Sequence, residues 1–257
     1  KTALEFIKTD PNERIGLIGG EPTLHSHFDQ ILSLLINDSS VKNVMVFTNG
    51  ITLDQYVRQL TNPKFHILVN CNDPKDIGQR AFDKMHSNLK LLINDYYMKD
   101  RITLGINIYD SSFHYHHVLD LLQEFSFDNV RFSIVVPNSS EKRSINVDNY
   151  FLSIKPRFIE FLSDMINADI MPHYDCNKMP SCLLSKEEIH YFSSLFDEKQ
   201  HAREKMGLPR IDFSPSDNAI YTKDVLCSPV IDIRQDLSAI RCFGLSDCTK
   251  VQIHEFS

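Results

Sequence analysis

The feature that most constrains the fold is the alternation of short β-rich runs with amphipathic helical stretches over the first two-thirds of the 257-residue chain. Between the β-rich runs, apolar residues recur at helical spacing, as at Phe28, Ile31, Leu32 and Leu35. This alternation predicts βα units around a parallel sheet, either an open doubly wound sheet or part of a barrel. The five predicted strands are residues 14–18, 43–48, 65–70, 102–108 and 129–136.

Composition and charge narrow the class of protein. Hydrophobic residues make up 42% of the chain, which is enough for a sizeable core and excludes a disordered or fibrous protein. A formal net charge of −7, with 27 scattered Lys and Arg residues, disfavours a nucleic-acid partner. No apolar run reaches the roughly 20 residues of a membrane span, and the sequence does not open with a charged and then apolar leader. We therefore expect a cytoplasmic protein that binds neither nucleic acid nor membranes.

The loop after the first predicted strand has a composition suited to ligand binding. Gly19 and Gly20 let the backbone approach a ligand closely, Pro22 stiffens the turn, and Glu21 offers an acceptor for an ammonium group. In open α/β sheets and in barrels alike, ligands bind at the carboxyl ends of the strands, where this loop falls. The loop would suit an amino-acid moiety, and a Gly-Gly turn between a strand and a helix is also a common tight connection.

Cysteines are concentrated in the last third of the chain. Cys71 lies in an apolar strand, where a buried and inert thiol is expected, whereas the other five cysteines fall between Cys176 and Cys248. Those five are candidate ligands of zinc or of an iron–sulfur cluster, or else separately buried thiols. We divide the chain into a core of residues 1–170 and a Cys-rich extension of residues 171–257. The extension ends in a predicted hairpin formed by residues 230–234 and 239–243.

The sequence from Gly19 to Thr23, Gly-Gly-Glu-Pro-Thr, resembles the loop by which radical S-adenosylmethionine enzymes hold the amino group of their cofactor. Thr48 and Asn49, at the end of the next predicted strand, are similar to the Thr-Asn-Gly strand end of the same family. The resemblance implies an α/β fold, a partial (β/α)6 TIM-like barrel that here lacks its first strand. It covers roughly residues 1–140.

The family's catalytic [4Fe-4S] cluster is held by a Cys-x3-Cys-x2-Cys loop after the first barrel strand. The sequence contains no such triplet. Residues 2–7 have the pattern of a helix end, so the resemblance places the triplet upstream of Lys1 and implies that this chain is a fragment. We therefore expect the fragment alone to be inactive in radical chemistry.

The resemblance also assigns further contacts to the cofactor. Asn70 stands where related peptide-modifying enzymes carry a Ser near the ribose, and Asn107 lies where the family contacts the ribose or the carboxylate. Val135 is the candidate neighbour of the adenine. The cofactor-binding residues implied in this way are Gly19, Gly20, Glu21, Pro22, Thr23, Thr48, Asn49, Asn70, Asn107 and Val135.

Many peptide-modifying members of the family carry a Cys-rich C-terminal extension that binds auxiliary [4Fe-4S] clusters. The resemblance implies that four thiols of this chain ligate one such cluster, with zinc as the alternative metal and Cys248 as an alternate or external ligand. The four ligands are Cys176, Cys182, Cys227 and Cys242.

The resemblance implies an enzyme that binds S-adenosylmethionine, generates a 5′-deoxyadenosyl radical and modifies a peptide or another substrate containing an amino acid. A flavodoxin or ferredoxin is the expected electron donor. Two other interpretations remain open. One is a non-catalytic, peptide-binding barrel with a structural four-cysteine zinc site. The other is an ordinary (β/α) barrel hydrolase or lyase that uses Glu21, Asp73 or Asp110 as its carboxylate.

Overall fold

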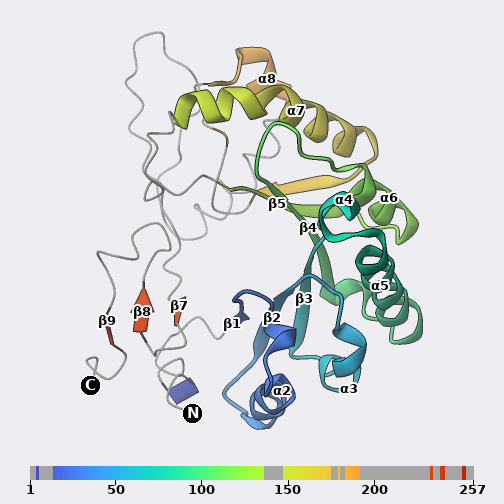
Figure 1. Cartoon of the computed structure of the whole chain (residues 1–257), viewed down its shortest axis with the longest axis vertical. Helices are drawn as coiled ribbons and strands as arrows, with labels where there is room; N and C mark the ends of the chain where they lie inside the picture. Colours follow the sequence, from blue (N-terminus) through green and yellow to red (C-terminus); the bar gives the residue numbers. More distant parts are fainter. Residues whose placement is uncertain are drawn as a thin grey trace.

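The structure, a computed structural model, describes residues 4–5, 14–135, 147–174, 179, 183–191, 232–233, 238–240 and 251–252. Its main feature is a parallel sheet with the strand order β1-β2-β3-β4-β5-β6 (Figure 1). The strands are β1 (Arg14–Leu17), β2 (Asn43–Thr48), β3 (Phe65–Asn70), β4 (Ile102–Ile108), β5 (Asn129–Ile134) and β6 (Met171–Tyr174).

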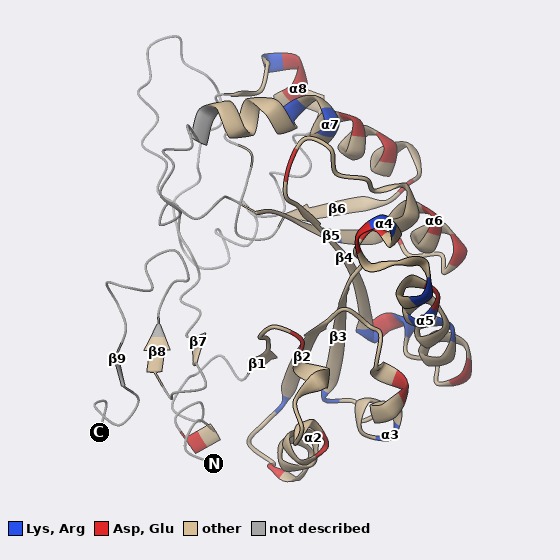
Figure 2. Cartoon of the chain, in the orientation of Figure 1, with Lys and Arg blue, Asp and Glu red and all other residues tan. Residues whose placement is uncertain are grey.

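Helices alternate with these strands, as the sequence predicted. Figure 1 shows the strands fanning into an arc whose outer side carries the helices, and Figure 2 shows that charged residues are mostly on the helices and loops rather than on the strands. The helical segments are η1 (Pro22–Leu24), α2 (Phe28–Asn37), η2 (Leu53–Tyr56), α3 (Val57–Leu60), α4 (Pro74–Ile77), α5 (Gln79–Lys90), η3 (Leu91–Asp95), η4 (Lys99–Arg101), α6 (His116–Glu124), α7 (Val147–Asn167) and α8 (Lys186–Tyr191).

The two faces of the sheet differ in chemistry. Residues aligned across parallel strands lie on the same face, and the aligned set Val46, Ile67 and Ile102 is buried. This is the helix-covered face, because a Cβ added at Gly50 would meet both Val69 of β3 and Met85 of α5. The apolar core therefore lies mainly between the sheet and the helices, and the opposite face carries polar residues beside apolar ones such as Leu68.

That opposite face, which we call the inner face, is identified by one row of the register. The row runs from Asn70 through Gly105 and Arg131 to His173, across β3, β4, β5 and β6. Asn70, Arg131 and His173 are half-buried rather than sealed in the core. Along this row, the sheet thus presents polar side chains on the side away from its helices.

The predicted fold class is confirmed, with one strand more than the sequence indicated. The five predicted strands are present, two of them with earlier ends, since β1 ends at Leu17 and β5 at Ile134. The sixth strand, Met171–Tyr174, pairs in parallel with β5 just beyond the boundary placed at residue 170. The parallel sheet therefore continues for four residues into the segment assigned to the extension.

A second, antiparallel sheet has the order β7-β8-β9, formed by Asp232–Ile233, Ser238–Ile240 and Val251–Gln252. The pairing of β7 with β8 agrees with the predicted hairpin, and β9 was not predicted. Among the described residues, no helix combines the length and the apolar character needed to cross a membrane.

Candidate functional site

The loop between β1 and η1 is open on the side of its two glycines. Gly19 and Gly20 are exposed, and, apart from their chain neighbours, no atom of the described residues lies within 4 Å of a Cβ built at either position. Glu21 then caps the short helix η1, because its side chain accepts a hydrogen bond from the backbone N–H of Thr23. The local sequence therefore gives a rigid turn preceded by accessible backbone.

The carboxylate of Glu21 joins the loops after β1 and β2. Its Oε1 atom accepts hydrogen bonds from Thr23 Oγ1 at 2.6 Å, from Thr23 N at 3.2 Å and from Thr48 Oγ1 at 2.7 Å. Its Oε2 atom accepts one from the backbone N–H of Asn49 at 2.7 Å. Because a carboxylate has about four lone-pair sites, two on each oxygen, acceptor capacity for a ligand remains at Oε2.

Two further contacts fasten the same loops together. The hydroxyl proton of Thr23 is used on Glu21, so in its contact with Thr52 the Thr52 hydroxyl is the donor. The hydroxyl of Tyr56, in η2, donates to the backbone carbonyl of Thr23 at 3.0 Å. Sequence analysis missed Thr52 and Tyr56, because neither belongs to a motif and both act through contacts with a loop about 30 residues earlier.

The other predicted cofactor contacts lie on the inner face or at the end of β5. Asn107 aligns with Ser133, and Val135 lies directly after β5, where its backbone N–H donates to the Ile108 carbonyl at 2.8 Å. Asn70, at the end of β3, has a buried side-chain oxygen that no described residue contacts with a hydrogen bond. A buried acceptor of this kind is costly unless a ligand or water donates to it. Asn70 and Asn107 therefore face one side of the sheet, and Val135 follows the end of β5.

Two basic residues of the inner face were not singled out from the sequence. Arg131 is placed next to Gly105 by the register, and its Cδ atom lies 3.5 Å from the position of an added Gly105 Cβ. His173 aligns with Arg131 on the neighbouring strand β6. Gly105 thus leaves room beside Asn70 for the stem of Arg131, a signal visible only once the strand register is known.

Tyr150, in α7, links the loop after β4 to the residue after β5 through its hydroxyl. Its hydroxyl contacts the backbone carbonyls of Tyr109 and Val135, the latter at 2.5 Å. Burial and the negative charge of Asp110 raise the pKa of Tyr150 to about 12, so its hydroxyl keeps its proton over the physiological range. Tyr150 is therefore a hydrogen-bond donor that fixes the backbone at the predicted adenine neighbour.

The residues named for an ordinary hydrolase or lyase are engaged in their own turns. Asp73 accepts a hydrogen bond from Lys75 N at 2.7 Å and caps α4. Asp110 accepts from both the backbone and the hydroxyl of Ser112, and these bonds hold its pKa below the usual value. Local capping accounts for the contacts of both carboxylates, which gives this interpretation no support.

The structure describes Cys71 but not the five C-terminal cysteines. Cys71 is buried, and burial raises the pKa of its thiol to about 12, which agrees with the predicted inert thiol. Cys248 and the four predicted cluster ligands Cys176, Cys182, Cys227 and Cys242 lie outside the described residues. Within the described segments, no group of three or more His, Cys, Asp or Glu side chains is arranged to hold a metal ion.

Comparison with solved structures identifies the fold. SuiB of Streptococcus suis matches with a TM-score of 0.56 and 15% identity, over 98% of this chain and 55% of SuiB. The structure described as anSMEcpe with bound AdoMet matches with a TM-score of 0.59 and 17% identity, over 99% of this chain and 68% of that one. SuiB bound to its precursor peptide SuiA gives a TM-score of 0.59 at 14% identity.

These matches concern the fold and only part of the larger proteins. The chain spans about half the length of SuiB, and no protein-family model and no curated protein matches its sequence. The shared fold agrees with the family that the loop from Gly19 to Thr23 resembles. The chain therefore has the same partial-barrel α/β fold as these solved structures.

Proposed function

We propose that this chain is the core of a radical S-adenosylmethionine enzyme that modifies a peptide. The observation that carries the proposal is the Glu21 carboxylate, which locks the glycine loop after β1 onto Thr48 and Asn49 at the end of β2. In a parallel sheet, the loops at adjacent carboxyl ends form the ligand site. The chain shares its fold with solved structures whose bound molecules are S-adenosylmethionine and a precursor peptide.

The residues of the site fit the parts of S-adenosylmethionine. The exposed backbone of Gly19 and Gly20, with the remaining lone pair of Glu21 Oε2, would accept the methionine ammonium group. The buried oxygen of Asn70 would accept from a ribose hydroxyl, and Asn107 offers a second amide on the same face. Tyr150 would hold the backbone at Val135 beside the adenine.

The cofactor carries the radical chemistry, and the protein supplies binding and orientation. When bound, S-adenosylmethionine and a reduced [4Fe-4S] cluster would supply the radical chemistry that removes a hydrogen atom from the substrate. The cluster's ligands would come from outside this chain, and a flavodoxin or ferredoxin of the cytoplasm would donate the electron. Cys176, Cys182, Cys227 and Cys242 are proposed to hold an auxiliary cluster.

The inner face suits a polar substrate. Arg131 and His173 stand in the same register row as Asn70, so a group bound by Arg131 would lie two strands from the ribose contact. Arg binds carboxylates with two parallel hydrogen bonds. A peptide with an acidic side chain or a free carboxyl terminus is therefore the substrate type that this face favours.

Cleavage of S-adenosylmethionine tests the proposal directly. The full-length protein, reconstituted with iron and sulfide without oxygen and reduced with dithionite, should convert S-adenosylmethionine to 5′-deoxyadenosine. Glu21→Ala should lose this product at unchanged iron content, whereas Glu124→Ala, a change at the surface of α6, should retain it. Absence of 5′-deoxyadenosine from a wild-type protein with its full iron content would refute the proposal.

A further inference from the structure

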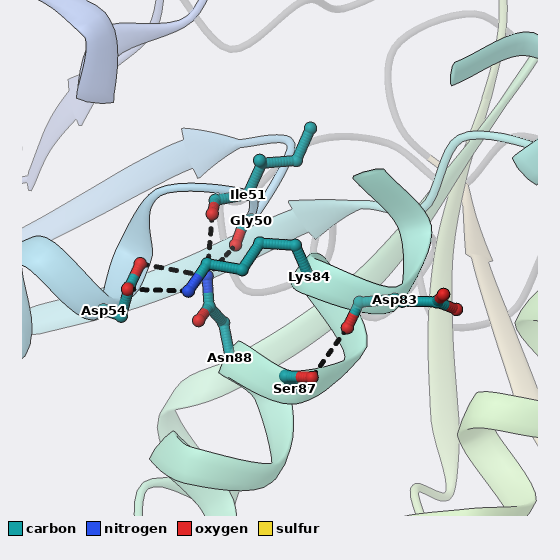
Figure 3. A network of polar contacts seen from close by, with 7 residues as sticks. All are labelled: Gly50, Ile51, Asp54, Asp83, Lys84, Ser87 and Asn88. Carbon is teal, nitrogen blue, oxygen red and sulfur yellow. Dashed lines mark hydrogen bonds and ion pairs between the residues drawn. The ribbon is translucent and has the colours of Figure 1, made fainter. Parts of the chain in front are cut away.

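Asn88 of α5 is buried beneath the loop that follows β2, far from any motif in the sequence. Its side chain is 2% exposed, and its Nδ2 atom lies 2.9 Å from the backbone carbonyl oxygens of both Gly50 and Ile51 (Figure 3). Asp54 lies 3.5 Å from the same nitrogen and forms an ion pair with Lys84, one turn earlier on α5. Asn88 thus attaches helix α5 to the loop by hydrogen bonds, and the Lys84–Asp54 ion pair is a second link between α5 and η2.

An amide is well matched to this place. An Asn side chain has two N–H donors on one nitrogen, and here two carbonyl oxygens, a buried one of Gly50 and a partly buried one of Ile51, face that nitrogen. Gly50 has a φ of +79°, and a Cβ at this position would lie 2.8 Å from Met85 Cγ, so the loop is folded tightly against α5. Without the amide, two carbonyls in a tight turn would lose their hydrogen bonds.

The contacts of Asn88 continue to the proposed cofactor loop. Gly50 N donates to Thr48 Oγ1 at 3.1 Å, and the Thr48 hydroxyl donates in turn to Glu21. Ile51 N donates to the side-chain oxygen of Asn49, and the backbone N–H of Asn49 donates to Glu21 Oε2. Glu21 thus contacts this segment through Thr48 and Asn49. Both residues lie within two positions of Gly50, whose carbonyl accepts a hydrogen bond from Asn88.

We propose that Asn88 is a positioning residue for S-adenosylmethionine: it fixes the Gly50 and Ile51 carbonyls, and through Thr48 and Asn49 it sets the orientation of the Glu21 carboxylate. The inference rests on the proposed function, because it assumes that the Glu21 loop receives the cofactor's amino group. Asn88 itself does not touch the cofactor. Its effect is therefore confined to the amino-acid end of the ligand.

The test compares two ligands that differ at that end. S-adenosylmethionine carries the amino-acid group, whereas 5′-methylthioadenosine has the nucleoside without it. Both dissociation constants are measured by equilibrium dialysis on the full-length protein with its clusters, for wild type, Asn88→Ala and Ser87→Ala. Ser87 is the matched control, because it lies next to Asn88 on α5, is exposed, and its hydroxyl donates to the Asp83 carbonyl within the same helix (Figure 3).

Asn88→Ala should weaken S-adenosylmethionine binding about tenfold, the effect of one hydrogen bond of ordinary strength. Binding of 5′-methylthioadenosine should change less than twofold, and Ser87→Ala should leave both constants unchanged. An equal loss for both ligands would mean a general destabilisation of the barrel and would overturn the inference. Unchanged S-adenosylmethionine binding in Asn88→Ala would overturn it as well.

Asn88→Asp provides a second readout. An ionised carboxylate here would face the Gly50 and Ile51 carbonyls and the charge of Asp54, with Lys84 as the neighbouring cation. Only the protonated acid can donate to a carbonyl, so the S-adenosylmethionine affinity of Asn88→Asp, relative to wild type, should fall as the pH rises from 5.5 to 8.5. A profile parallel to that of wild type would contradict the inference.

The two proposals fail in different ways. If the wild-type protein, with its clusters intact, does not bind S-adenosylmethionine, the proposed function is wrong. If the wild-type protein binds S-adenosylmethionine and Asn88→Ala binds it equally well, the function stands and the role of Asn88 is refuted.

Discussion

At the scale of single residues, Glu21 links two loops that are 27 residues apart in the sequence. Three donors surround its Oε1 atom, two from Thr23 and one from Thr48, and the Asn49 N–H binds Oε2. Each donor would be left without an acceptor if the carboxylate were removed. The same side chain that the family resemblance places near a ligand therefore also holds the site together.

Glu21→Gln is expected to destabilise the fold by about 1–3 kcal/mol, because one acceptor oxygen is replaced by an NH2 group that faces N–H and O–H donors. Urea unfolding followed by circular dichroism measures the loss. Glu124→Gln is the control, since Glu124 forms exposed pairs with His86 and Lys90 and should change stability by less than about 1 kcal/mol. Equal stability of the Glu21 and Glu124 variants would contradict the role of Glu21 in joining the two loops.

Cys71 is expected to resist alkylation in the folded protein. Burial raises the pKa of its thiol to about 12, so at pH 8 the reactive thiolate is essentially absent. An unfolded thiol titrates near about 8.5, so the stability contributed by the neutral buried thiol falls as the pH rises above that value. Iodoacetamide labelling at pH 8, read by peptide mass spectrometry, should modify Cys71 only after unfolding; complete labelling of the native protein would contradict this burial.

The sequence predicted the roles of Glu21 and Cys71 for different reasons. It predicted the surroundings of Cys71 more fully than the partners of Glu21. Cys71 lies at the end of an apolar run, and such runs are buried in parallel sheets. Glu21 was recognised within a motif, but its partners could not be predicted from spacing, because Thr48 and Asn49 meet it only when β1 and β2 pair. Asn88 had no sequence signal, since a buried Asn in a helix looks like any polar helical residue.

At the scale of secondary-structure elements, Lys64 connects the end of α2 to the start of β3. Its Nζ atom donates to the backbone carbonyls of Leu35, Ile36 and Asp38, which lie at the carboxyl end of the helix. The last carbonyls of a helix lack internal partners, and a cation there also interacts favourably with the helix dipole. Lys64 therefore helps to define where α2 ends.

Lys64→Met should lower the free energy of unfolding by about 1–2 kcal/mol, because three carbonyls lose a charged donor while the aliphatic stem is retained. Lys42→Met is the matched control, since Lys42 is exposed and makes one such bond, to Ser39. Thermal and urea unfolding of the two variants measure the difference. An effect of Lys64→Met no larger than that of Lys42→Met would contradict the capping role.

The limits of the strands were easier to predict than the number of strands in the sheet. The strands β2, β3 and β4 have the predicted limits, because each is an apolar run bounded by polar residues. Strand β6, Met-Pro-His-Tyr, contains Pro172, which argues against a central strand, and it was missed. Its place at the edge of the six-stranded sheet explains why the proline is tolerated there.

At the scale of the whole molecule, the predicted barrel fold is confirmed, and the role of the extension stays a prediction. The extension's cysteines lie outside the described residues. The 257-residue chain, reconstituted without oxygen, is expected to hold about four irons, as one [4Fe-4S] cluster requires. A double variant, Cys182→Ala with Cys242→Ala, should lose them; one zinc or no metal in the wild-type chain would contradict the auxiliary cluster.

The proposed function depends most on whether the loop from Gly19 to Thr23 receives S-adenosylmethionine. Equilibrium dialysis of labelled S-adenosylmethionine against the full-length, cluster-containing protein tests this directly, with Glu21→Ala beside Glu124→Ala. We expect one saturable site in wild type and in Glu124→Ala, and an affinity at least about tenfold weaker in Glu21→Ala, a loss of about 1.4 kcal/mol. Equal binding by Glu21→Ala and wild type, or no binding by a wild-type protein with intact clusters, would contradict the assignment of this site.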